Sequence, residues 1–547
     1  MTKMQAGWLA GLFLLVYVAP LGIRPMFIPD ETRYAEIPRE MRASGDWVVP
    51  RFNGWDYFEK PVLGYWLIAA SQEVLGETPF AVRLPSALAA GVSALAILLL
   101  MRRRKDASPG FAVALFLAAP LVYLCGTFAV LDGPFSAFVA LALVLYFCGD
   151  QAESPGRRRW CHAGFGLACG LAFLTKGLLG LVLPVLVIVP YLLWRRKARD
   201  LLRLPWMPLA VAAAVILPWA MAVHHRAPDF WRYFIWHEHI QRFLDPGTAQ
   251  HPEPFWYFIP VLAGGALPLM VLLPSAVAGL RRIGKTPLVM FCLLWVAMHF
   301  LFFSASSGKL GTYILPCLPP LAVLVALGAV EFLKAGETRR FDVAARGLGT
   351  LVLIALWGFA ALHILPFPPA WRVYAWSEVG VFALGAVAVV AFGGALWGSA
   401  MAREPLRKLA CFAAAPVLVL ACFPLVFPVQ ALRGNAPLHL LARNAGQVKA
   451  DTLILTTPHY VGAVNWCFKR ADAWLLRGAG ELTYGLERAP DDRRFVPLEE
   501  MGNFVAGKVG EGGLVLFVSE RAYSQYQVDL PPPRYIDRAA GFVFVQY

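Results

Sequence analysis

Residues 313–332 read YILPCLPPLAVLVALGAVEF, and Glu331 is the one charged side chain among them. An α-helix rises about 1.5 Å per residue, so about 20 apolar residues cross the hydrocarbon core of a bilayer. The stretch is long enough and apolar enough to do so. It therefore predicts a membrane-spanning helix.

Similar stretches recur along most of the chain of 547 residues, of which 59% are hydrophobic and 15% charged. Soluble proteins have about 45–50% apolar and about 25% charged residues, so this composition excludes a soluble enzyme, a disordered chain and a disulfide scaffold. We predict an α-helical polytopic membrane protein with about thirteen spans. The candidate spans are 6–24, 84–101, 111–128, 134–149, 161–175, 177–194, 206–223, 257–280, 287–303, 313–332, 347–365, 378–398 and 409–428.

The formal net charge of +14 comes largely from loops that alternate along this series of spans. Lysines and arginines collect in cytoplasmic loops of membrane proteins, so the charge requires no nucleic acid partner. The rule places the N-terminus in the cytoplasm, and the segments 25–83, 224–256, 304–312 and 429–547 on the other side. The basic loops are 102–105, 157–159, 195–203, 281–285, 334–346 and 403–408.

The last part of the chain differs in kind, because long apolar runs stop after Val426. Short β-like runs lie at 452–455, 514–518 and 542–545, with helix-like stretches at 433–446 and 496–509. We therefore predict a membrane domain over 1–428 and a small α/β domain over 429–547 outside the membrane.

The first outer loop, 25–83, is long enough to suggest a functional role. Apolar positions at Tyr34, Ile37 and Met41 predict a helix of two or three turns. The run 62–74 is too short to span comfortably and suits a helix lying along the membrane interface.

Cations and carboxylates gather in the outer segments. Lys60, Arg242 and Lys309 come from three separate loops, and their convergence would suit an anionic ligand such as a phosphate. Asp30 and Asp132 add acid–base or sugar-binding capacity. The alternative for Asp30 is a helix N-cap, and the alternative for Asp132 is part of an Asp-Gly-Pro turn.

Glu59, His239 and His251 form the outer set with suitable ligand chemistry for a divalent metal ion, zinc first. His237 is an alternate ligand. The alternative is that these histidines are simply hydrogen-bonded near the interface. No organic cofactor is expected.

Several separated motifs resemble the GT-C lipid-phosphate-dependent glycosyltransferases, and most closely the family of lipid A 4-amino-4-deoxy-L-arabinose transferases (ArnT). The resemblance extends from Asp30 through at least Tyr313, and the motifs occur in the same order as in the family. The C-terminal domain contains no motif that matches. The motifs are DETRYAE at 30–36, SGDW at 44–47, YFEKP at 57–61, EHIQRF at 238–243 and GKL at 308–310.

The resemblance implies a bacterial inner-membrane protein, with a GT-C catalytic domain over 1–428 and a C-terminal domain in the periplasm. It implies an undecaprenyl phosphate-linked aminoarabinose donor and a lipid A phosphate acceptor among the membrane lipids. Masking lipid A phosphates would give resistance to polymyxin and other cationic peptides. The residues expected to act are Asp30 and Asp132 in catalysis and Lys60, Arg242, Lys309, Tyr313, Arg33, Tyr34 and Arg83 in binding the donor.

Two other kinds of protein stay open at this point. A related GT-C transferase would move another sugar from a polyprenyl phosphate to a protein or glycan hydroxyl. A transporter or flippase would carry ionisable residues near the middle of its spans, whereas the charges here cluster at one membrane face.

Overall fold

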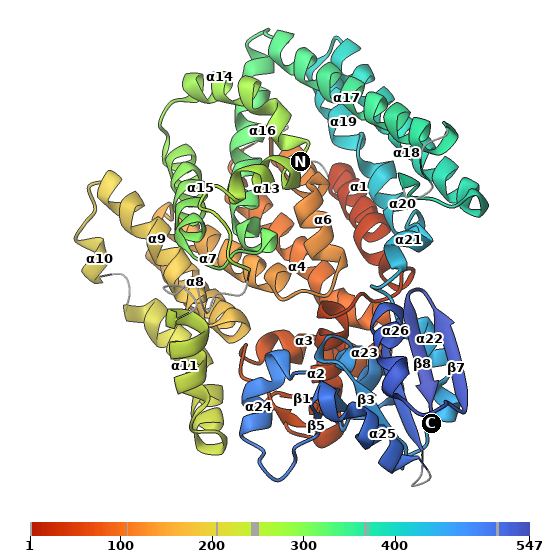
Figure 1. Cartoon of the computed structure of the whole chain (residues 1–547). Helices are drawn as coiled ribbons and strands as arrows, with labels where there is room; N and C mark the ends of the chain where they lie inside the picture. The colour runs from red at the N-terminus through yellow and green to blue at the C-terminus, as the bar shows by residue number, and fades with distance from the viewer. Residues whose placement is uncertain are drawn as a thin grey trace. The chain divides into compact units, whose positions relative to one another are not determined.

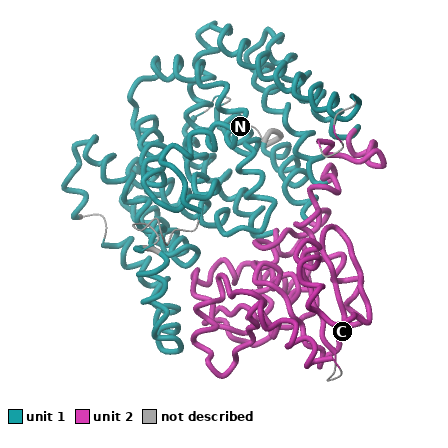
Figure 2. Tube along the Cα trace, in the orientation of Figure 1, with its two compact units in different colours: residues 1–21, 84–366, 383–424 teal, residues 22–83, 367–382, 425–547 magenta. Residues whose placement is uncertain are grey.

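The computed structural model describes residues 3–104, 106, 108–203, 206–241, 251–365, 368, 371–509 and 513–547 (Figure 1). The chain divides into two compact units, coloured separately in Figure 2. Unit 1 comprises Met1–Leu21, Leu84–Pro366 and Ala383–Pro424, and unit 2 comprises Gly22–Arg83, Phe367–Phe382 and Leu425–Tyr547.

Helices build unit 1, and two of them, α4 and α18, begin in residues assigned to unit 2. Its longer elements are α1 (Lys3–Phe13), α4 (Pro79–Leu100), α5 (Ser108–Ala118), α6 (Pro120–Thr127), α7 (Asp132–Asp150), α8 (Pro155–Lys176), α9 (Leu179–Trp194), α11 (Trp206–Arg226), α13 (Phe258–Gly265), α14 (Leu273–Ile283), α15 (Pro287–Ala305), α16 (Leu318–Lys334), α17 (Arg339–Ile364), α18 (Val379–Met401), α19 (Pro405–Ala414) and α20 (Val417–Cys422). Its remaining elements are η1 (Leu14–Val18), η2 (Ala19–Gly22), α10 (Asp200–Arg203), η3 (Arg232–Gln241), η4 (Leu269–Leu272), η5 (Gly311–Cys317) and η8 (Phe423–Leu425).

The predicted spans all fall on helices. Within the described residues, eight helices are long and apolar enough to cross a membrane, and two bent pairs raise the number to ten. The pairs are α5 with α6, bent by 66°, and α13 with the helix Leu269–Ile283, bent by 91°. Ala6–Gly22 and Leu179–Trp194 are shorter apolar helices, and α8 covers the predicted span 161–175. The polytopic helical fold is therefore confirmed.

Unit 2 joins the outer loop to the C-terminal segment. The loop contributes α2 (Asp30–Ser44), β1 (Arg51–Phe52), β2 (Trp55–Asp56) and α3 (Leu63–Leu75). The later residues contribute η7 (Trp376–Glu378), α21 (Val429–Leu432), α22 (Leu438–Arg443), η9 (Ala445–Gln447), β3 (Leu453–Thr456), α23 (Pro458–Phe468), β4 (Trp474–Leu476), η10 (Gly480–Leu482), α24 (Thr483–Glu487), β5 (Phe495–Val496), η11 (Leu498–Glu500), α25 (Met501–Lys508), β6 (Leu514–Ser519), α26 (Glu520–Tyr526), η12 (Gln527–Asp529), β7 (Tyr535–Ala539) and β8 (Phe542–Gln546).

A six-stranded sheet in the order β5-β4-β3-β6-β8-β7 organises the C-terminal part of unit 2. Strands β5, β4, β3 and β6 pair in parallel, and β8 and β7 continue the sheet antiparallel. The side chains of β6 from Leu514 to Val518 are completely buried, as parallel strands covered on both faces require. This sheet confirms the predicted α/β character of the segment.

The outer loop contains the two predicted helices, α2 and α3. Helix α2 begins at Asp30, with Asp30 and Glu31 in a first turn whose positive dipole favours acidic side chains. Asp30 is the first helical residue rather than the cap, because Pro29 occupies the cap position. Gly45 ends the helix with a left-handed φ of 69°.

A buried ion cluster connects the two ends of the outer loop, near Arg24 and Arg83. The Glu31 carboxylate accepts two hydrogen bonds from Arg24, at 2.6 and 2.9 Å, and two from Arg83, at 2.7 and 2.9 Å. Arg83 is fully buried and also donates to the carbonyls of Arg24 and Pro25, each at 2.9 Å. We call Arg24, Glu31 and Arg83 the Glu31 cluster.

Burial alone would raise the pKa of Glu31, but the hydrogen bonds and charges of Arg83 and Arg24 lower it to about 2. A carboxyl group whose folded pKa is depressed stabilises the fold above its unfolded pKa, 4.5 here. This stabilisation is lost as the pH falls from about 4.5 toward 2.

We expect Glu31→Gln to lower the free energy of unfolding by about 3–5 kcal/mol, because it leaves two buried arginines without their anion. Denaturant unfolding of the purified protein in detergent measures this loss at neutral pH. Glu73→Gln is the matched control, since the side chain of Glu73 is 68% exposed in its pair with Arg42 and such pairs contribute about 0–1 kcal/mol. Equal losses in the two variants would contradict the role given to Glu31, as would a Glu31→Gln deficit that does not shrink with falling pH.

Candidate active site

Arg33 lies between two carboxylates in unit 2. Its guanidinium forms an ion pair of 2.5 Å with Asp30 and a second ion pair with Glu481 of η10. The hydroxyl of Tyr57 donates to Glu481 at 3.1 Å, and the Tyr34 ring centroid lies 5.0 Å from the Arg33 Cζ atom. We call Arg33, Asp30, Glu481 and Tyr57 the Arg33 cluster.

Close helix packing brings Glu481 to this position. Helices α2 and α23 pack together, and a Cβ atom at Gly462 would lie 3.1 Å from the backbone nitrogen of Arg33. Only glycine permits this approach without a shift of backbone. The C-terminal segment can therefore place η10, which lies near Pro458 at the start of α23, beside the first turn of α2.

The charges of the cluster shift the pKa values of its acidic and basic groups in predictable directions. Burial opposes ionisation of Glu481, but Arg33, the hydrogen bond from Tyr57 and the charge of Lys60 lower its pKa overall. Burial lowers the pKa of His459 against the opposing charges of Asp30 and Glu481, which favours the neutral imidazole. The exposed part of the cluster is Asp30, whose side chain is 59% exposed compared with 10% for Arg33.

Lys60 follows the buried Tyr57–Glu59 segment of the outer loop. Its ammonium group donates to the Glu59 carbonyl at 2.8 Å and is near enough to Glu481 to lower that carboxyl's pKa. Unit 2 therefore combines the predicted Asp30, Arg33, Tyr34 and Lys60 in one region of the outer loop.

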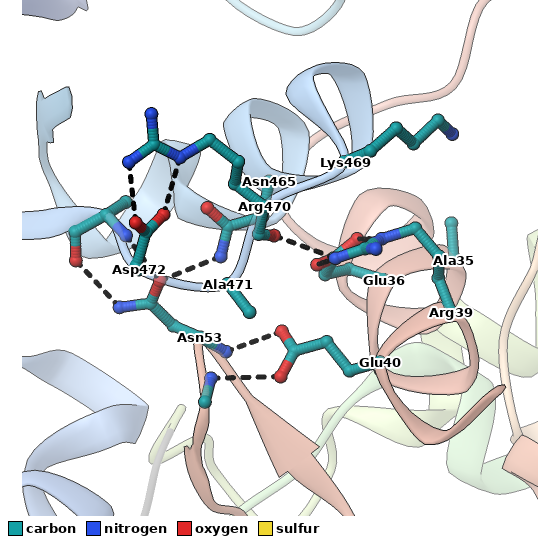
Figure 3. A network of polar contacts seen from close by, with 12 residues as sticks. Ala35, Glu36, Arg39, Glu40, Asn53, Asn465, Lys469, Arg470, Ala471 and Asp472 are labelled. Carbon is teal, nitrogen blue, oxygen red and sulfur yellow. Dashed lines mark hydrogen bonds and ion pairs between the residues drawn. The ribbon is translucent and has the colours of Figure 1, made fainter. Parts of the chain in front are cut away.

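A network of buried polar groups links α2, the β1–β2 hairpin and the C-terminal segment (Figure 3). Glu40 accepts the backbone N–H groups of Asn53 and Gly54 at 2.7 and 2.9 Å. The Asn53 side chain in turn accepts from Asn465 at 2.8 Å and bonds both backbone groups of Ala473, at 2.8 and 2.9 Å. These bonds fix the β1–β2 hairpin between α2 and the C-terminal segment.

The same figure shows Arg39 of α2 reaching the C-terminal segment. Arg39 pairs with Glu36 at 2.6 Å and donates to the carbonyl of Arg470 at 2.8 Å. Because Arg39 is buried, its guanidinium needs these partners. The helix that carries Asp30 and Arg33 is thus held along its length.

A second cluster lies in unit 1. Lys176, the last residue of α8, forms a 2.6 Å ion pair with Asp132, the first residue of α7. The Lys176 ammonium lies 4.4 Å from the centroid of the Tyr313 ring, within cation–π range. The side chains of Lys176 and Asp132 are 10% and 15% exposed, so this ion pair is largely shielded from solvent.

Lys309 is held by backbone carbonyl groups. Its ammonium donates to the backbone carbonyl of Glu253 at 2.8 Å and to that of Ser306. Its backbone N–H donates to the backbone carbonyl of His251 at 3.1 Å. Lys309 is buried, and desolvation lowers the pKa of its ammonium group. Among the residues that the structure describes, two carbonyl groups accept from this ammonium, which has three N–H donors.

The remaining predicted residues have different outcomes. Arg83 belongs to the Glu31 cluster, and its complete burial favours a structural role over a ligand contact. Arg242 and the side chain of His239 lie outside the described residues. Glu59 and His251 belong to different units.

The metal prediction is not tested by this structure. Among the residues described, no group of three or more His, Cys, Asp or Glu side chains is arranged to hold a metal ion. The side chain of His239 is not among them, so zinc bound by Glu59, His239 and His251 stays a prediction.

Sequence reasoning missed Glu481, Tyr57 and His459. Tyr57 stands in the recognised YFEKP motif and could have been proposed from it. Glu481 and His459 lie in the C-terminal segment, where no motif marked them. Their contact with residues 30–60 depends on the packing of α23 against α2.

Comparisons with known proteins agree with this fold. A model of the dolichyl-phosphate-mannose-protein mannosyltransferase family matches residues 9–234, and a model of the C-terminal domain of arabinosyl transferase ArnT matches residues 432–546. An undecaprenyl phosphate-α-4-amino-4-deoxy-L-arabinose arabinosyl transferase of Aeromonas hydrophila is 42% identical over 87% of this chain and 86% of its own length. One from Serratia proteamaculans is 37% identical over 97% of this chain and 96% of its own.

The solved structures give the same result. The chain is similar to ArnT from Cupriavidus metallidurans bound to undecaprenyl phosphate, with a TM-score of 0.83 and 25% identity, covering 99% of this chain and 98% of that one. The membrane domain of this chain therefore has the GT-C glycosyltransferase fold. The chain belongs to the undecaprenyl phosphate-α-4-amino-4-deoxy-L-arabinose arabinosyl transferase (ArnT) family, and the predicted family is confirmed.

We expect Glu481→Gln to lower the rate of glycosyl transfer by roughly 10- to 100-fold, because Arg33 loses one charged partner and a small misplacement of site residues is costly. The measurement is the initial rate with a lipid-linked sugar donor, alongside the melting temperature. Glu487→Gln, in the exposed end of α24, is the control and should keep the full rate. A Glu481→Gln protein with unchanged rate would remove the C-terminal segment from the site.

Proposed function

We propose that this protein transfers 4-amino-4-deoxy-L-arabinose from undecaprenyl phosphate to a phosphate group of lipid A. We place the reaction at the periplasmic face of a bacterial inner membrane, with the N-terminus in the cytoplasm. The observation that carries the proposal is the identity of about 40% with arabinosyl transferases over nearly the whole chain. The product would carry less negative charge and would bind polymyxin less tightly.

The positive side chains suit the donor's leaving group. As the bond between the sugar's anomeric carbon and the phosphate oxygen breaks, negative charge grows on undecaprenyl phosphate. In this proposal Lys60 binds that phosphate, with Arg33 and Tyr34 beside it in the outer loop. Arg242, Lys309 and Tyr313 stay predicted donor ligands.

The two aspartates suit positioning better than proton removal. A phosphate monoester is already an anion at neutral pH, so its oxygen can attack the anomeric carbon without a strong general base. Attack opposite to the leaving phosphate inverts the anomeric configuration. Asp30 and Asp132 each pair with a cation, Arg33 and Lys176 respectively, and in this proposal they orient the sugar, its ammonium group or the acceptor.

A second function is favoured by one specific observation. The model matching residues 9–234 describes mannosyltransferases that act on proteins. A transferase of that kind would deliver a sugar to a hydroxyl group and would need a base to remove the hydroxyl proton. The nature of the acceptor therefore distinguishes the two functions.

Purified protein incubated with undecaprenyl phosphate-aminoarabinose and a lipid A precursor tests the proposal. We expect the lipid A precursor to gain the mass of one aminoarabinose, read by mass spectrometry. A dephosphorylated lipid A precursor is the control acceptor and should gain nothing. Transfer to the dephosphorylated acceptor, or to a peptide hydroxyl instead, would favour the second function.

We expect Lys60→Ala to lower the transfer rate by roughly 100-fold, since removing one group that stabilises developing charge costs about 10²–10³-fold. The rate with undecaprenyl phosphate-aminoarabinose and the donor KM provide the measurement. Lys449→Ala removes a lysine from unit 2 outside both clusters and should leave the rate unchanged. A Lys60→Ala protein with the parent's rate would exclude Lys60 from the phosphate site.

A further inference from the structure

A cavity of about 250 Å³ opens in unit 1 at the ends of α4, α7, α14 and α15. Its wall is mainly apolar and includes Leu100, Phe147, Val289 and Leu327, with Gln151 and Thr286 as polar members. Its rim carries three consecutive arginines, 102–104, which directly follow α4. The same cavity is therefore lined by apolar side chains on its wall and by guanidinium groups at its rim.

The arginines retain capacity for an anion. Arg103 pairs with Glu153 at 3.1 Å, but the two side chains are 58% and 90% exposed, and such pairs are weak. Arg104 pairs with Asp106 at 3.2 Å. Arg102 is exposed at the rim and forms no ion pair with the residues that the structure describes.

Two further features add positive potential. Asp106 is shared with Lys334, which approaches it to 2.9 Å, so this carboxylate is divided between two cations. The first turn of α15 forms part of the wall, with Thr286 as its cap, and the positive end of a helix dipole favours anions. The surroundings of the cavity therefore carry a surplus of positive charge.

The cavity lies far from Asp132, the candidate residue on α7. Phe147 stands near the C-terminal end of α7, whereas Asp132 begins the same helix, roughly 22 Å away at 1.5 Å per residue. The loops at the cavity end of the helices, 102–105 and 281–285, are among those predicted to be cytoplasmic. In a bilayer, the cytoplasmic ends of spanning helices lie where phospholipid headgroups meet acyl chains.

We propose that this cavity binds an anionic phospholipid, with the phosphodiester on the arginine rim and part of an acyl chain along the apolar wall. Basic pockets between membrane helices on the cytoplasmic side suit anionic headgroups. The apolar wall distinguishes this ligand from free phosphate, which has no group to cover Leu100 or Leu327. The guanidinium groups distinguish it from a zwitterionic lipid, whose ammonium they repel.

Native mass spectrometry of the full chain, released from detergent micelles with added lipid, tests the proposal. The probes are phosphatidylglycerol, phosphatidylethanolamine and inorganic phosphate. We expect phosphatidylglycerol to remain bound to the parent protein. The triple variant Arg102→Gln, Arg103→Gln, Arg104→Gln should bind it at least roughly tenfold more weakly. Each basic side chain near an anionic lipid contributes about fivefold in binding.

The triple variant Arg157→Gln, Arg158→Gln, Arg159→Gln is the matched control. It removes the same charge from another basic segment predicted to face the same side, and none of its residues lines the cavity. It should bind phosphatidylglycerol as the parent does. Equal loss in both triple variants would reduce the effect to general surface charge and overturn the site.

A further variant, Leu288→Trp, fills the cavity without changing charge. We expect it to bind phosphatidylglycerol at least roughly tenfold more weakly, with the melting temperature of the lipid-free protein preserved. Phosphatidylglycerol binding retained in Leu288→Trp would overturn the proposal. So would equal retention of phosphatidylethanolamine, or displacement of phosphatidylglycerol by millimolar inorganic phosphate.

Discussion

The conformation of the outer loop depends on the ion pairs of the buried, ionised Glu31 carboxylate with Arg24 and Arg83. Taking such a charge out of water costs several kcal/mol, and only well-placed counter-charges and hydrogen bonds offset it. The hydrogen bonds to Glu31 include four from the two arginines and one from the backbone N–H of Phe27. Since Arg24 precedes the loop's first helix and Arg83 closes the loop, one carboxylate fixes both ends.

The position of the candidate active-site residues follows from that anchor. Asp30 and Arg33 flank Glu31 within the first turn of α2, so the direction of this turn decides where their side chains lie. Further along the same helix, Glu40 accepts a backbone N–H of the hairpin, and Arg39, which is paired with Glu36, donates to the C-terminal segment. The helix is therefore fixed at both ends by interactions that the proposed chemistry does not use.

The sequence predicted most of the fold because apolar length is a strong signal. Every predicted span falls on helical segments, and β3, β6 and β8 were predicted from short β-like runs of sequence. Strands β4 and β5 were missed because they have three and two residues, and β7 because its side chains are mostly exposed and polar.

The candidate site was only partly predictable. Asp30, Lys60 and Asp132 could be singled out because carboxylates and cations are conspicuous in outer loops of an apolar chain. Arg83 was assigned to the donor on the same ground, yet its burial with Glu31 gives it a structural task. Glu481 could not be found, since its pairing with Arg33 spans 448 positions of sequence and follows from helix packing alone.

The bond between Asn53 and Asn465 has a consequence for how the protein is made, because these residues are 412 positions apart. Ribosomes add about 5–20 residues per second, so the outer loop waits roughly 20 to 80 s for its partners to be synthesised. Until then the side-chain amide of Asn53, buried in the finished protein, lacks the groups of Asn465 and Ala473 that it bonds there. Membrane insertion of the spans would therefore be largely complete before this loop can take its final form, and a chain terminated after the last span would lack the partners that the loop requires.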